Sequence, residues 1–255
     1  MGFSPPSISN AHDPLATTGA DCRNHDPFVN VLVLAAHPDD EVLGCGGTIA
    51  KLAQAGHEVS IAILGEGITS RYRDREQAEQ ALLTQLHGDS QKVADLLGAK
   101  QLFLRGLPDN RFDSVPLLDI VKIIEDLIAE TKPEVVYTQH GGDLNIDHVM
   151  LYRATLTATR PVGAYSVKKV YAYEVASSTE WAFAQFAPAF RPNVFVDIAD
   201  KLETKIQAME CYESEARPFP HPRSPDALRA IARRWGSVVG VSAAEAFELV
   251  REVQA

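Results

Sequence analysis

The chain has 255 residues, which suits one large α/β domain or two smaller ones. Apolar residues make up 45% and charged residues 23% of the composition, which excludes a disordered, collagen-like or coiled-coil protein as a description of the whole chain. The formal charge is −10, and this excess of acid repels phosphate backbones and anionic lipids. We therefore expect no nucleic-acid partner, and because no apolar run is long enough to span a membrane we expect no membrane insertion.

The cysteines and the N-terminal segment indicate in which cellular compartment the protein is expected. The chain has an odd number of cysteines, and they lie far apart in the sequence, at Cys22, Cys45 and Cys211. The sequence therefore predicts neither a disulfide framework nor a thiolate zinc site, and we expect a cytoplasmic location. Residues 1–27 lack the basic and apolar regions of a secretory signal. We expect a disordered tail at residues 1–27 and a single domain at residues 28–255.

From Phe28 onward, short apolar runs alternate with helical patterns, which is typical of an α/β protein with a mostly parallel sheet and helices on both faces. Val31–Ala36 is continuously apolar, as expected of a strand that is buried on both sides. In chain order, the pattern predicts strands at 31–36, 59–64, 101–105 and 134–138, and helices at 48–55, from about 74 to 97, and at 116–131.

The last third of the chain is less regular and is predicted to elaborate the same domain. Strands are expected at 167–175 and 193–197, with one of them as the candidate for an antiparallel strand. Helices are expected at 201–215, 225–235 and 243–253. Residues 217–225 contain four prolines and are predicted to form a rigid loop, where a lid or specificity wall could lie beside Glu213, Arg217 and His221.

A cluster of polar residues follows the first predicted strand: His37, Pro38, Asp39, Asp40 and Glu41. Pro38 disfavours helical geometry at His37, so the imidazole should project from the strand end and meet Asp40, with Asp39 offset. A nitrogen ligand and a carboxylate at the carboxyl end of a buried strand suit Zn²⁺ or a similar ion. The alternative is that the acidic turn caps the following helix, but adjacent carboxylates in poor contact with solvent repel one another unless a cation lies among them.

The glycines that follow this cluster allow a dinucleotide-binding interpretation. Gly44 and Gly46 would be the first two glycines of a G-x-G-x-x-G motif, but the third position is Ile49, and the neighbouring acids would repel a pyrophosphate. We expect instead that these small residues let the chain pack closely against a strand.

A second cluster follows the strand predicted at 134–138 and contains His140, Asp143, Asn145, Asp147 and His148. Either histidine taken alone would more often be a structural residue than a ligand. However, loops that follow two parallel strands open onto the same crevice, so His37, Asp40 and one histidine of the second cluster can complete a three-ligand metal site with an open position for water.

The two clusters together resemble the PIG-L/LmbE-like family of zinc-dependent N-deacetylases. The resemblance rests on the A-H-P-D-D-E block at 36–41 and the D-x-N-x-D-H block at 143–148, and it extends over most of the chain from Val31, including the segment 108–113. It implies a Rossmann-like fold without a bound dinucleotide, and substrates that are mostly N-acetylglucosaminyl conjugates.

The resemblance also implies roles for individual residues. His37, Asp40 and His148 match the family's metal ligands, for Zn²⁺ or another divalent ion such as Fe²⁺, and Asp39 matches the general base. A metal-bound water would attack the acetamide carbonyl while Asp39 takes its proton. Asp147 would orient a histidine from outside the ligand shell.

One position departs from the family pattern. Asn145 stands where many members carry a histidine that assists the oxyanion or the leaving group. Asn145 can donate a hydrogen bond but cannot deliver a proton, so His140 is the alternative candidate for that role. Arg71, Asp109, Asn110 and Arg111 are expected to bind the substrate.

The function expected from the sequence is metal-dependent removal of the N-acetyl group from an amino sugar or its conjugate. The alternatives are an amidase that acts on a non-sugar or thiol-conjugate amide, and a nucleotide-binding Rossmann module without hydrolysis. The expected partner is a small amino-sugar substrate, and the sequence leaves a homo-oligomer open.

Overall fold

The computed structural model describes residues 28–73, 80–162 and 165–254. Its centre is a seven-stranded sheet with the strand order β3-β2-β1-β4-β5-β7-β6. The strands are β1 (Asn30–Ala35), β2 (Glu58–Gly65), β3 (Gln101–Leu107), β4 (Val135–Gln139), β5 (Lys169–Tyr173), β6 (Val194–Asp197) and β7 (Ala244–Glu252). The expected tail at 1–27 and the first residues of the helix expected from about 74 lie outside the described residues.

Strands β1 to β5 are parallel, and β1 lies at the centre between β2 and β4. β7 runs antiparallel to both β5 and β6. The α/β class and the mostly parallel sheet are therefore confirmed. Neither β5 nor β6 is the antiparallel strand that the sequence suggested, because β7 takes that place.

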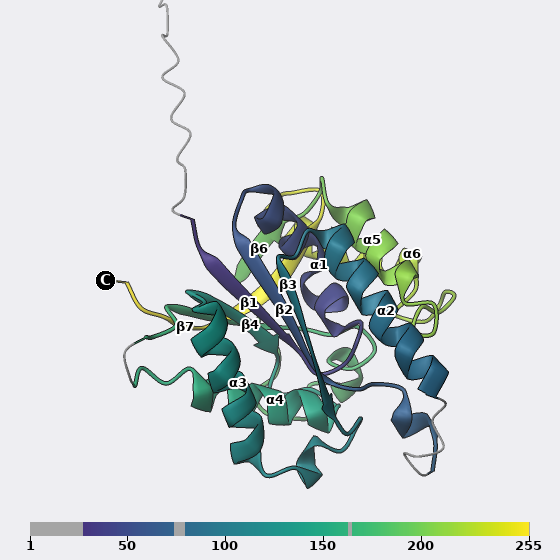
Figure 1. Ribbon diagram of the computed structural model, residues 1–255. Helices are drawn as coiled ribbons and strands as arrows, with labels where there is room; N and C mark the ends of the chain where they lie inside the picture. The colour runs from purple at the N-terminus through teal and green to yellow at the C-terminus, as the bar shows by residue number, and fades with distance from the viewer. Residues whose placement is uncertain (1–27, 74–79, 163–164, 255) are drawn as a thin grey trace, which may run out of the picture.

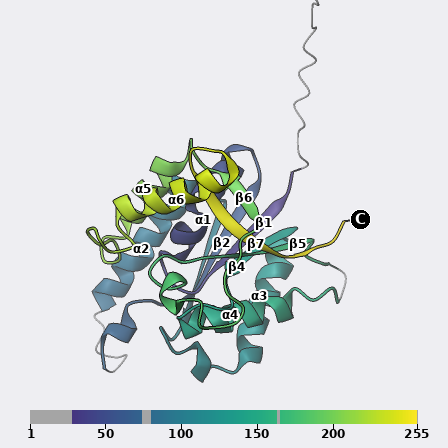
Figure 2. The same ribbon diagram turned by 180° about the vertical axis from the view of Figure 1, so that it is seen from behind.

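Helices cover both faces of the sheet (Figures 1 and 2). One layer contains α1 (Asp40–Gln54), α2 (Gln80–Leu97) and α5 (Leu202–Cys211), with α6 (Pro225–Val239) packed on α5, β6 and β7. The other layer contains α3 (Leu117–Thr131) and α4 (Ile146–Ala158). Short 3₁₀ turns lie at η1 (Thr69–Arg71), η3 (Phe112–Ser114) and η4 (Glu180–Ala182).

The helix predicted at 243–253 is wrong, because these residues form β7. The sequence is rich in Ala, Glu and Leu, which favour helices, but β7 fills the gap between β5 and β6 and bonds to a strand on each side. Pairing with β5 and β6 thus overrides the helix preference of these residues.

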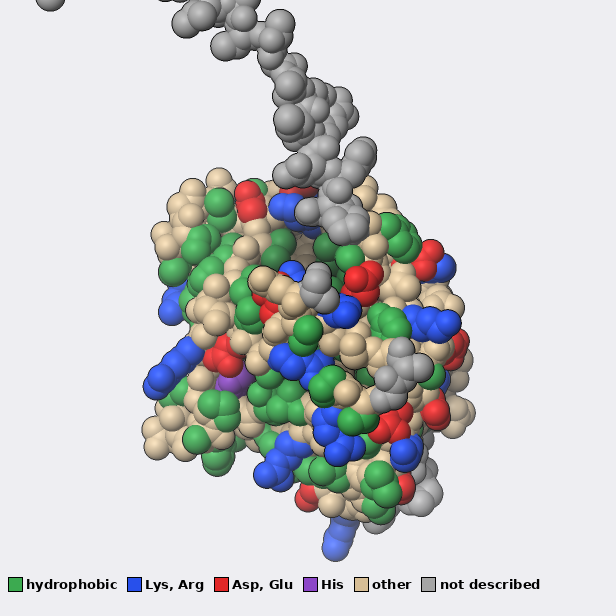
Figure 3. Space-filling model, turned by 90° about the vertical axis from the view of Figure 1, so that its left-hand side faces the viewer, with side chains coloured by type: hydrophobic (Ala, Val, Ile, Leu, Met, Phe, Trp, Pro, Cys, Tyr) green, Lys and Arg blue, Asp and Glu red, His purple; other side chains and the backbone are tan. Residues whose placement is uncertain are grey.

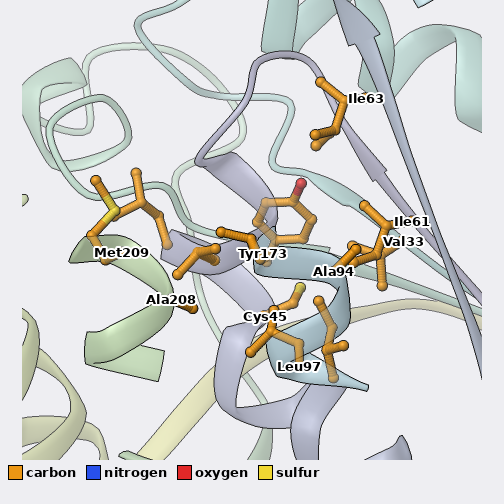
Figure 4. Close-up of a cluster of buried hydrophobic side chains, with 14 of the residues drawn as sticks. Val33, Cys45, Ile61, Ile63, Ala94, Leu97, Tyr173, Ala208 and Met209 are labelled. Carbon is orange, nitrogen blue, oxygen red and sulfur yellow. The ribbon is translucent and has the colours of Figure 1, made fainter. Parts of the chain in front are cut away.

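α1 begins at Asp40, eight positions before the helix start predicted from the sequence, so its first turns contain the glycines. A Cβ on Gly44 would lie 2.1 Å from Cδ2 of Tyr173, and one on Gly47 would lie 2.8 Å from Ile198. Tyr173 is fully buried and its hydroxyl donates a hydrogen bond to the Leu34 carbonyl, so the ring has little freedom to move. Figure 4 shows Tyr173 among the buried side chains of this layer, with Cys45 and Met209.

The close approach at Gly44 predicts a stability difference between two glycines in helices. Gly44→Ala is expected to lower the free energy of unfolding by about 1–3 kcal/mol, because the added methyl group must displace the Tyr173 ring. Gly88→Ala in α2, where a Cβ meets no atom within 4 Å, is expected to raise it by about 0.5–1 kcal/mol. Urea unfolding of both variants measures the difference, and equal effects would contradict the packing argument.

A buried ion pair between α5 and β7 forms hydrogen bonds with the backbone of α1. Lys205 of α5 donates from Nζ to Glu245 Oε1 of β7 at 2.6 Å and to the Leu43 carbonyl at 2.8 Å. Glu245 also accepts from the backbone N–H groups of Gly47 and Thr48, at 2.9 and 2.7 Å. A regular helix would join the Leu43 carbonyl to the Gly47 N–H, so this turn of α1 uses side chains from α5 and β7 as hydrogen-bond partners.

The surface shown in Figure 3 carries acidic and basic side chains interspersed among apolar ones. Over the described residues, no helix has the combination of length and apolar character that crossing a membrane requires.

Candidate active site

The first acidic motif lies in the turn between β1 and α1. Asp39 stands directly before α1 with φ of 110°, a strained backbone conformation for a residue with a side chain. Asp40 Oδ2 accepts a hydrogen bond from the His37 backbone N–H at 2.8 Å. This turn brings the two side chains together, with His37 Nδ1 3.4 Å from Asp40 Oδ2.

The second motif lies between β4 and α4. β4 ends at Gln139, and α4 begins with Asn145 as its N-cap, whose Oδ1 accepts from the Asp147 backbone N–H at 2.8 Å. His148 lies in the first turn of α4 and is buried. Because β1 and β4 are parallel neighbours, both loops open at the same edge of the sheet.

His37, Asp40 and His148 form one cluster, in which each offers a ligand atom within 4.8 Å of the others. His148 Nε2 lies 3.3 Å from Asp40 Oδ2. Asp40 Oδ2 is also held by the side-chain amide of Gln139, whose Nε2 donates at 3.0 Å. The sequence did not single out Gln139, although its place at the last position of β4 puts it beside the cluster.

The chemistry of this cluster fits a divalent metal. Neither ring nitrogen of His148 has a hydrogen-bond partner among the described residues, although both are buried. Burial alone would lower the pKa of His148, but the adjacent Asp40 and Asp143 carboxylates raise it to about 9. A buried site that holds a positive charge this strongly can hold a cation instead, and two imidazoles with a carboxylate suit Zn²⁺ or Fe²⁺.

Asp147 and Asp109 position His37 from the side away from Asp40. His37 Nε2 lies 2.9 Å from Asp147 Oδ2 and 3.3 Å from Asp109 Oδ1. Asp147 Oδ1 in turn accepts from the Phe112 backbone N–H at 2.8 Å. These contacts fix the ring so that Nδ1 faces Asp40, as expected of a carboxylate that orients a metal-binding histidine.

Asp143 supports His148 in the same way. Asp143 Oδ1 lies 3.2 Å from His148 Nδ1 and also accepts from the Ser178 hydroxyl, while Oδ2 accepts from the Thr179 hydroxyl at 2.6 Å. Burial raises the pKa of Asp143, but His148 and these hydroxyl groups outweigh burial and lower it. Asp143 is therefore a fixed anion beside His148.

Asp39 is offset from the cluster and pairs with Arg223, a residue that the sequence reasoning missed. Arg223 Nη1 donates to Asp39 Oδ2 at 2.7 Å and to Glu215 Oε2 at 3.0 Å. Burial raises the pKa of Asp39 well above its usual range, and the Arg223 guanidinium opposes that shift. A carboxylate whose pKa is brought nearer to neutrality is a stronger base than an ordinary aspartate.

The Arg223 pair predicts a change in pH dependence. Arg223→Met removes the charge that lowers the pKa of Asp39, so Asp39 keeps its proton to higher pH. If Asp39 acts as a base, the acidic limb of the profile of kcat/KM against pH is expected to move to higher pH. Arg233→Met, an exposed change on α6, is the matched control. An unchanged acidic limb in Arg223→Met would contradict the coupling.

A cavity of about 300 Å³ opens over the cluster. His37, Asp39, Asp40 and His148 lie in its wall, and the loops at 67–71, 109–110, 177–181 and 215–223 complete it. Arg217 and His221, which the sequence placed near a wall of the site, line this cavity, as does Trp181. We call this space the polar cavity.

Three of the four residues expected to bind substrate lie in the polar cavity. Asp109 Oδ2 accepts from the Ser70 backbone N–H at 2.9 Å, and Asn110 Nδ2 lies 3.1 Å from the Ser70 hydroxyl. Arg71 donates to Glu215 Oε1 at 2.5 Å. Arg111 is exposed and does not line the cavity.

Of the two residues considered for the oxyanion or proton-donor role, only Asn145 lines the polar cavity. Its Nδ2 donates to Asn110 Oδ1 at 2.9 Å. His140 is buried elsewhere: its Nδ1 accepts from the Gly142 N–H at 3.1 Å, its Nε2 lies 3.3 Å from Glu248 Oε2, and its ring packs against Phe190. The structure therefore does not bring His140 to the cluster.

The structure is thus a Rossmann-like α/β fold with a mostly parallel sheet, and its carboxylate and histidine cluster lies at the carboxyl edge of the parallel strands, in the wall of the polar cavity. Residues 32–159 match the family model described as PIG-L, GlcNAc-PI de-N-acetylase. The chain belongs to the PIG-L family, and the resemblance seen in the sequence is confirmed.

The chain is also similar in sequence to individual curated proteins and similar in fold to solved structures. The chain is 29% identical over 192 residues to the uncharacterized deacetylase YaiS of Escherichia coli K12, covering 72% of this chain and 90% of YaiS. It is 25% identical over 252 residues to the diacetylchitobiose deacetylase of Thermococcus kodakarensis, covering 90% and 87% of the two chains. GalB, the 4-carboxy-2-hydroxymuconate hydratase of Pseudomonas putida KT2440, shares the fold with a TM-score of 0.66 at 22% identity, over 88% of this chain and 97% of that chain.

Proposed function

We propose that this protein is a metal-dependent N-deacetylase that hydrolyses the acetamide of an N-acetylglucosamine-type amino sugar or conjugate. The observation that carries the proposal is the convergence of His37, Asp40 and His148 in the wall of one cavity, with Asp39 beside them. Membership of the PIG-L family and similarity to a diacetylchitobiose deacetylase support the substrate class.

The metal would be held by His37, Asp40 and His148, with Zn²⁺ as the first candidate and Fe²⁺ as the alternative. When bound, the ion supplies a Lewis acid that polarises the amide carbonyl and lowers the pKa of water. Asp147 contacts His37 and Asp143 contacts His148, and these carboxylates would orient the two imidazoles for ligation.

The residues of the chain would then move protons and place the sugar. Asp39, held by Arg223, takes a proton from the attacking water and returns it to the leaving amine. Asn145 lines the polar cavity and would donate a hydrogen bond to the developing oxyanion, but it cannot deliver a proton, so Asp39 would serve both proton-transfer steps. Asp109, Asn110 and Arg71 offer hydrogen-bonding groups for sugar hydroxyls.

The two alternative functions differ in how well the site supports them. The buried carboxylates of Asp39, Asp40 and Glu41 occupy the N-terminus of α1, where a nucleotide-binding protein would place a pyrophosphate, so a non-hydrolytic nucleotide-binding module is disfavoured. An amidase for a non-sugar or thiol-conjugate amide uses the same cluster. The polar lining at Asp109, Asn110 and Arg71 favours a hydroxyl-rich substrate over it.

Acetate release measures the proposed activity. The purified protein is incubated with methyl N-acetylglucosaminide, N-acetylglucosamine phosphate, diacetylchitobiose and a set of non-sugar acetamides, each with added Zn²⁺, with Fe²⁺ under exclusion of air, or with chelator. We expect acetate from at least one amino sugar, lost with chelator and restored by metal. Turnover of the non-sugar amides alone would replace the proposal with the amidase alternative. A cytoplasmic location stays a prediction from the sequence.

A further inference from the structure

A second cavity of about 680 Å³ lies beside the polar cavity, and its character is different. Aromatic and aliphatic side chains make up most of its wall, among them Phe183, Phe190, Phe219, Ile231 and Trp235. Its size and lining are those of a site for a small molecule with a large apolar part. We call it the apolar cavity.

The two cavities share their walls. In the segment 176–181, Ser177, Ser178 and Trp181 line the polar cavity, while Ala176, Thr179 and Glu180 line the apolar cavity. In the loop between α5 and α6, His221 and Arg223 line the polar cavity, while Phe219, Pro220 and Pro222 line the apolar one. Only one layer of chain therefore separates the two spaces along these segments.

Exposed aromatic side chains lie where these two segments reach the surface. Trp181 is 40% exposed, Phe219 66% and Phe183 75%. Trp181 belongs to the polar cavity and packs edge-on against His221, whereas Phe183 and Phe219 belong to the apolar cavity. Exposed aromatic side chains therefore belong to the walls of both cavities, and we call Trp181, Phe183 and Phe219 the rim.

Each charged group that lines the apolar cavity contacts another group of the protein. Lys205 and Glu245 pair with each other and with α1, and Arg234 stacks on the Trp235 ring at 4.0 Å. Glu174 lines the cavity and accepts a hydrogen bond from Trp235 Nε1 at 2.5 Å through Oε1. No other hydrogen bond to Glu174 is present among the described residues, so Oε2 is available to a ligand donor.

From the shared walls and the exposed aromatic side chains of the rim, we infer that the apolar cavity binds an apolar chain carried by the amino-sugar substrate whose amide lies in the polar cavity. The inference rests on the proposed function and narrows its substrate class to amphiphilic conjugates. The apolar chain crosses the rim at Trp181 and Phe219 and packs along α6. It is attached either at the anomeric oxygen or on the acyl side, and both attachments present the same apolar surface.

Two series of compounds separate these attachments. The first contains the methyl, butyl and hexyl glycosides of N-acetylglucosamine, and the second contains N-acetyl-, N-butanoyl- and N-hexanoylglucosamine. Release of the free amine is measured for all of them below their micelle concentrations. We expect kcat/KM to rise roughly threefold for each added methylene in one of the two series, as burial of each group removes apolar surface from water.

Ala230→Trp tests whether the apolar cavity is responsible for this rise. Ala230 is an exposed position of α6 that lines the cavity, so a larger side chain fills the space without disturbing the core. The variant is expected to abolish the rise with chain length and to leave kcat/KM for the methyl glycoside unchanged. Val238→Trp, also exposed on α6 but outside the cavity wall, is the matched control and should keep the rise.

A second variant guards against a folding defect in the first. Phe183 has φ of 50° and is exposed, and Asn tolerates this conformation, so Phe183→Asn should fold normally while removing one apolar wall. Phe183→Asn is expected to reduce the ratio of kcat/KM between the hexyl and methyl glycosides, or between the N-hexanoyl and N-acetyl compounds, by at least threefold.

The outcomes separate the inference from the proposed function. Turnover of the methyl glycoside with no dependence on chain length in either series overturns the inference and leaves the deacetylase intact. If no compound is turned over, the proposed function fails, and binding of the hexyl glycoside to the metal-loaded protein is measured by calorimetry. Binding that tightens with chain length and is lost in Ala230→Trp then still supports the apolar cavity, and its absence overturns it.

Discussion

Replacing Asp39 with Asn is expected to lower kcat by about 10²–10⁴-fold, because general acid–base catalysis contributes on that scale. Asn keeps the size of the side chain but cannot accept a proton from water. Asp39 is not in the cluster of His37, Asp40 and His148, so the metal content should stay the same. Acetate release and metal analysis of the same preparation measure both quantities.

Asp113→Asn is the matched control for this change, since Asp113 is exposed in η3 and lies outside the polar cavity. It should leave kcat unchanged. Full activity in Asp39→Asn with a normal metal content would remove Asp39 from the proposed mechanism. A loss of metal in that variant would instead assign Asp39 to the metal site.

His148→Gln is expected to weaken metal binding by more than about 100-fold and to abolish turnover, because it removes one of three ligands. The substitution also leaves the Asp40 and Asp143 carboxylates without the histidine that lies between them. We therefore expect the variant to need excess metal for any activity. Equilibrium dialysis against Zn²⁺ gives the affinity, and activity is followed in the same metal series.

His87→Gln provides the control, because His87 is exposed in α2 and belongs neither to the cluster nor to the wall of the polar cavity. It should bind metal and turn over substrate as the unmodified protein does. Unchanged metal affinity in His148→Gln would show that the cluster of His37, Asp40 and His148 is not the metal site.

The sequence predicted the elements that build the site because each has a strong local signal. The buried run at Val31–Ala36 and the strand at Val135–Gln139 are regular strands of a parallel sheet, and their ends carry the two motifs. Parallel pairing of β1 and β4 then brings the two loops to one edge without further information. The juxtaposition of His37, Asp40 and His148 follows from these local signals.

Other features depend on contacts that the sequence does not display. Arg223 reaches Asp39, and Glu215 accepts a hydrogen bond from Arg223. Both residues come from an irregular loop in the last third of the chain, where no periodic pattern gives a direction. The only signal was the run of prolines, which indicates a rigid loop but not what it faces.

His140 illustrates a limit of a different kind. Its position directly after β4 placed it near the cluster in sequence, but successive side chains at a strand end point to opposite faces. Gln139 therefore reaches Asp40, whereas His140 points toward Glu248 of β7. Because β7 was predicted as a helix, the partner of His140 was missing from the sequence interpretation.

The ion pair between Lys205 and Glu245 lies beyond the residues that match the family model, but it contacts a helix within them. The family match ends at residue 159, but Glu245 of β7 supplies hydrogen-bond acceptors to Gly47 and Thr48 in α1, and Lys205 of α5 supplies a donor to Leu43. A chain ending after α4 would lack these hydrogen-bond partners of α1, next to the helix start that carries Asp40. The last third of the chain thus completes the hydrogen bonding of the helix that carries Asp40, and we expect the matched segment not to fold as an independent module.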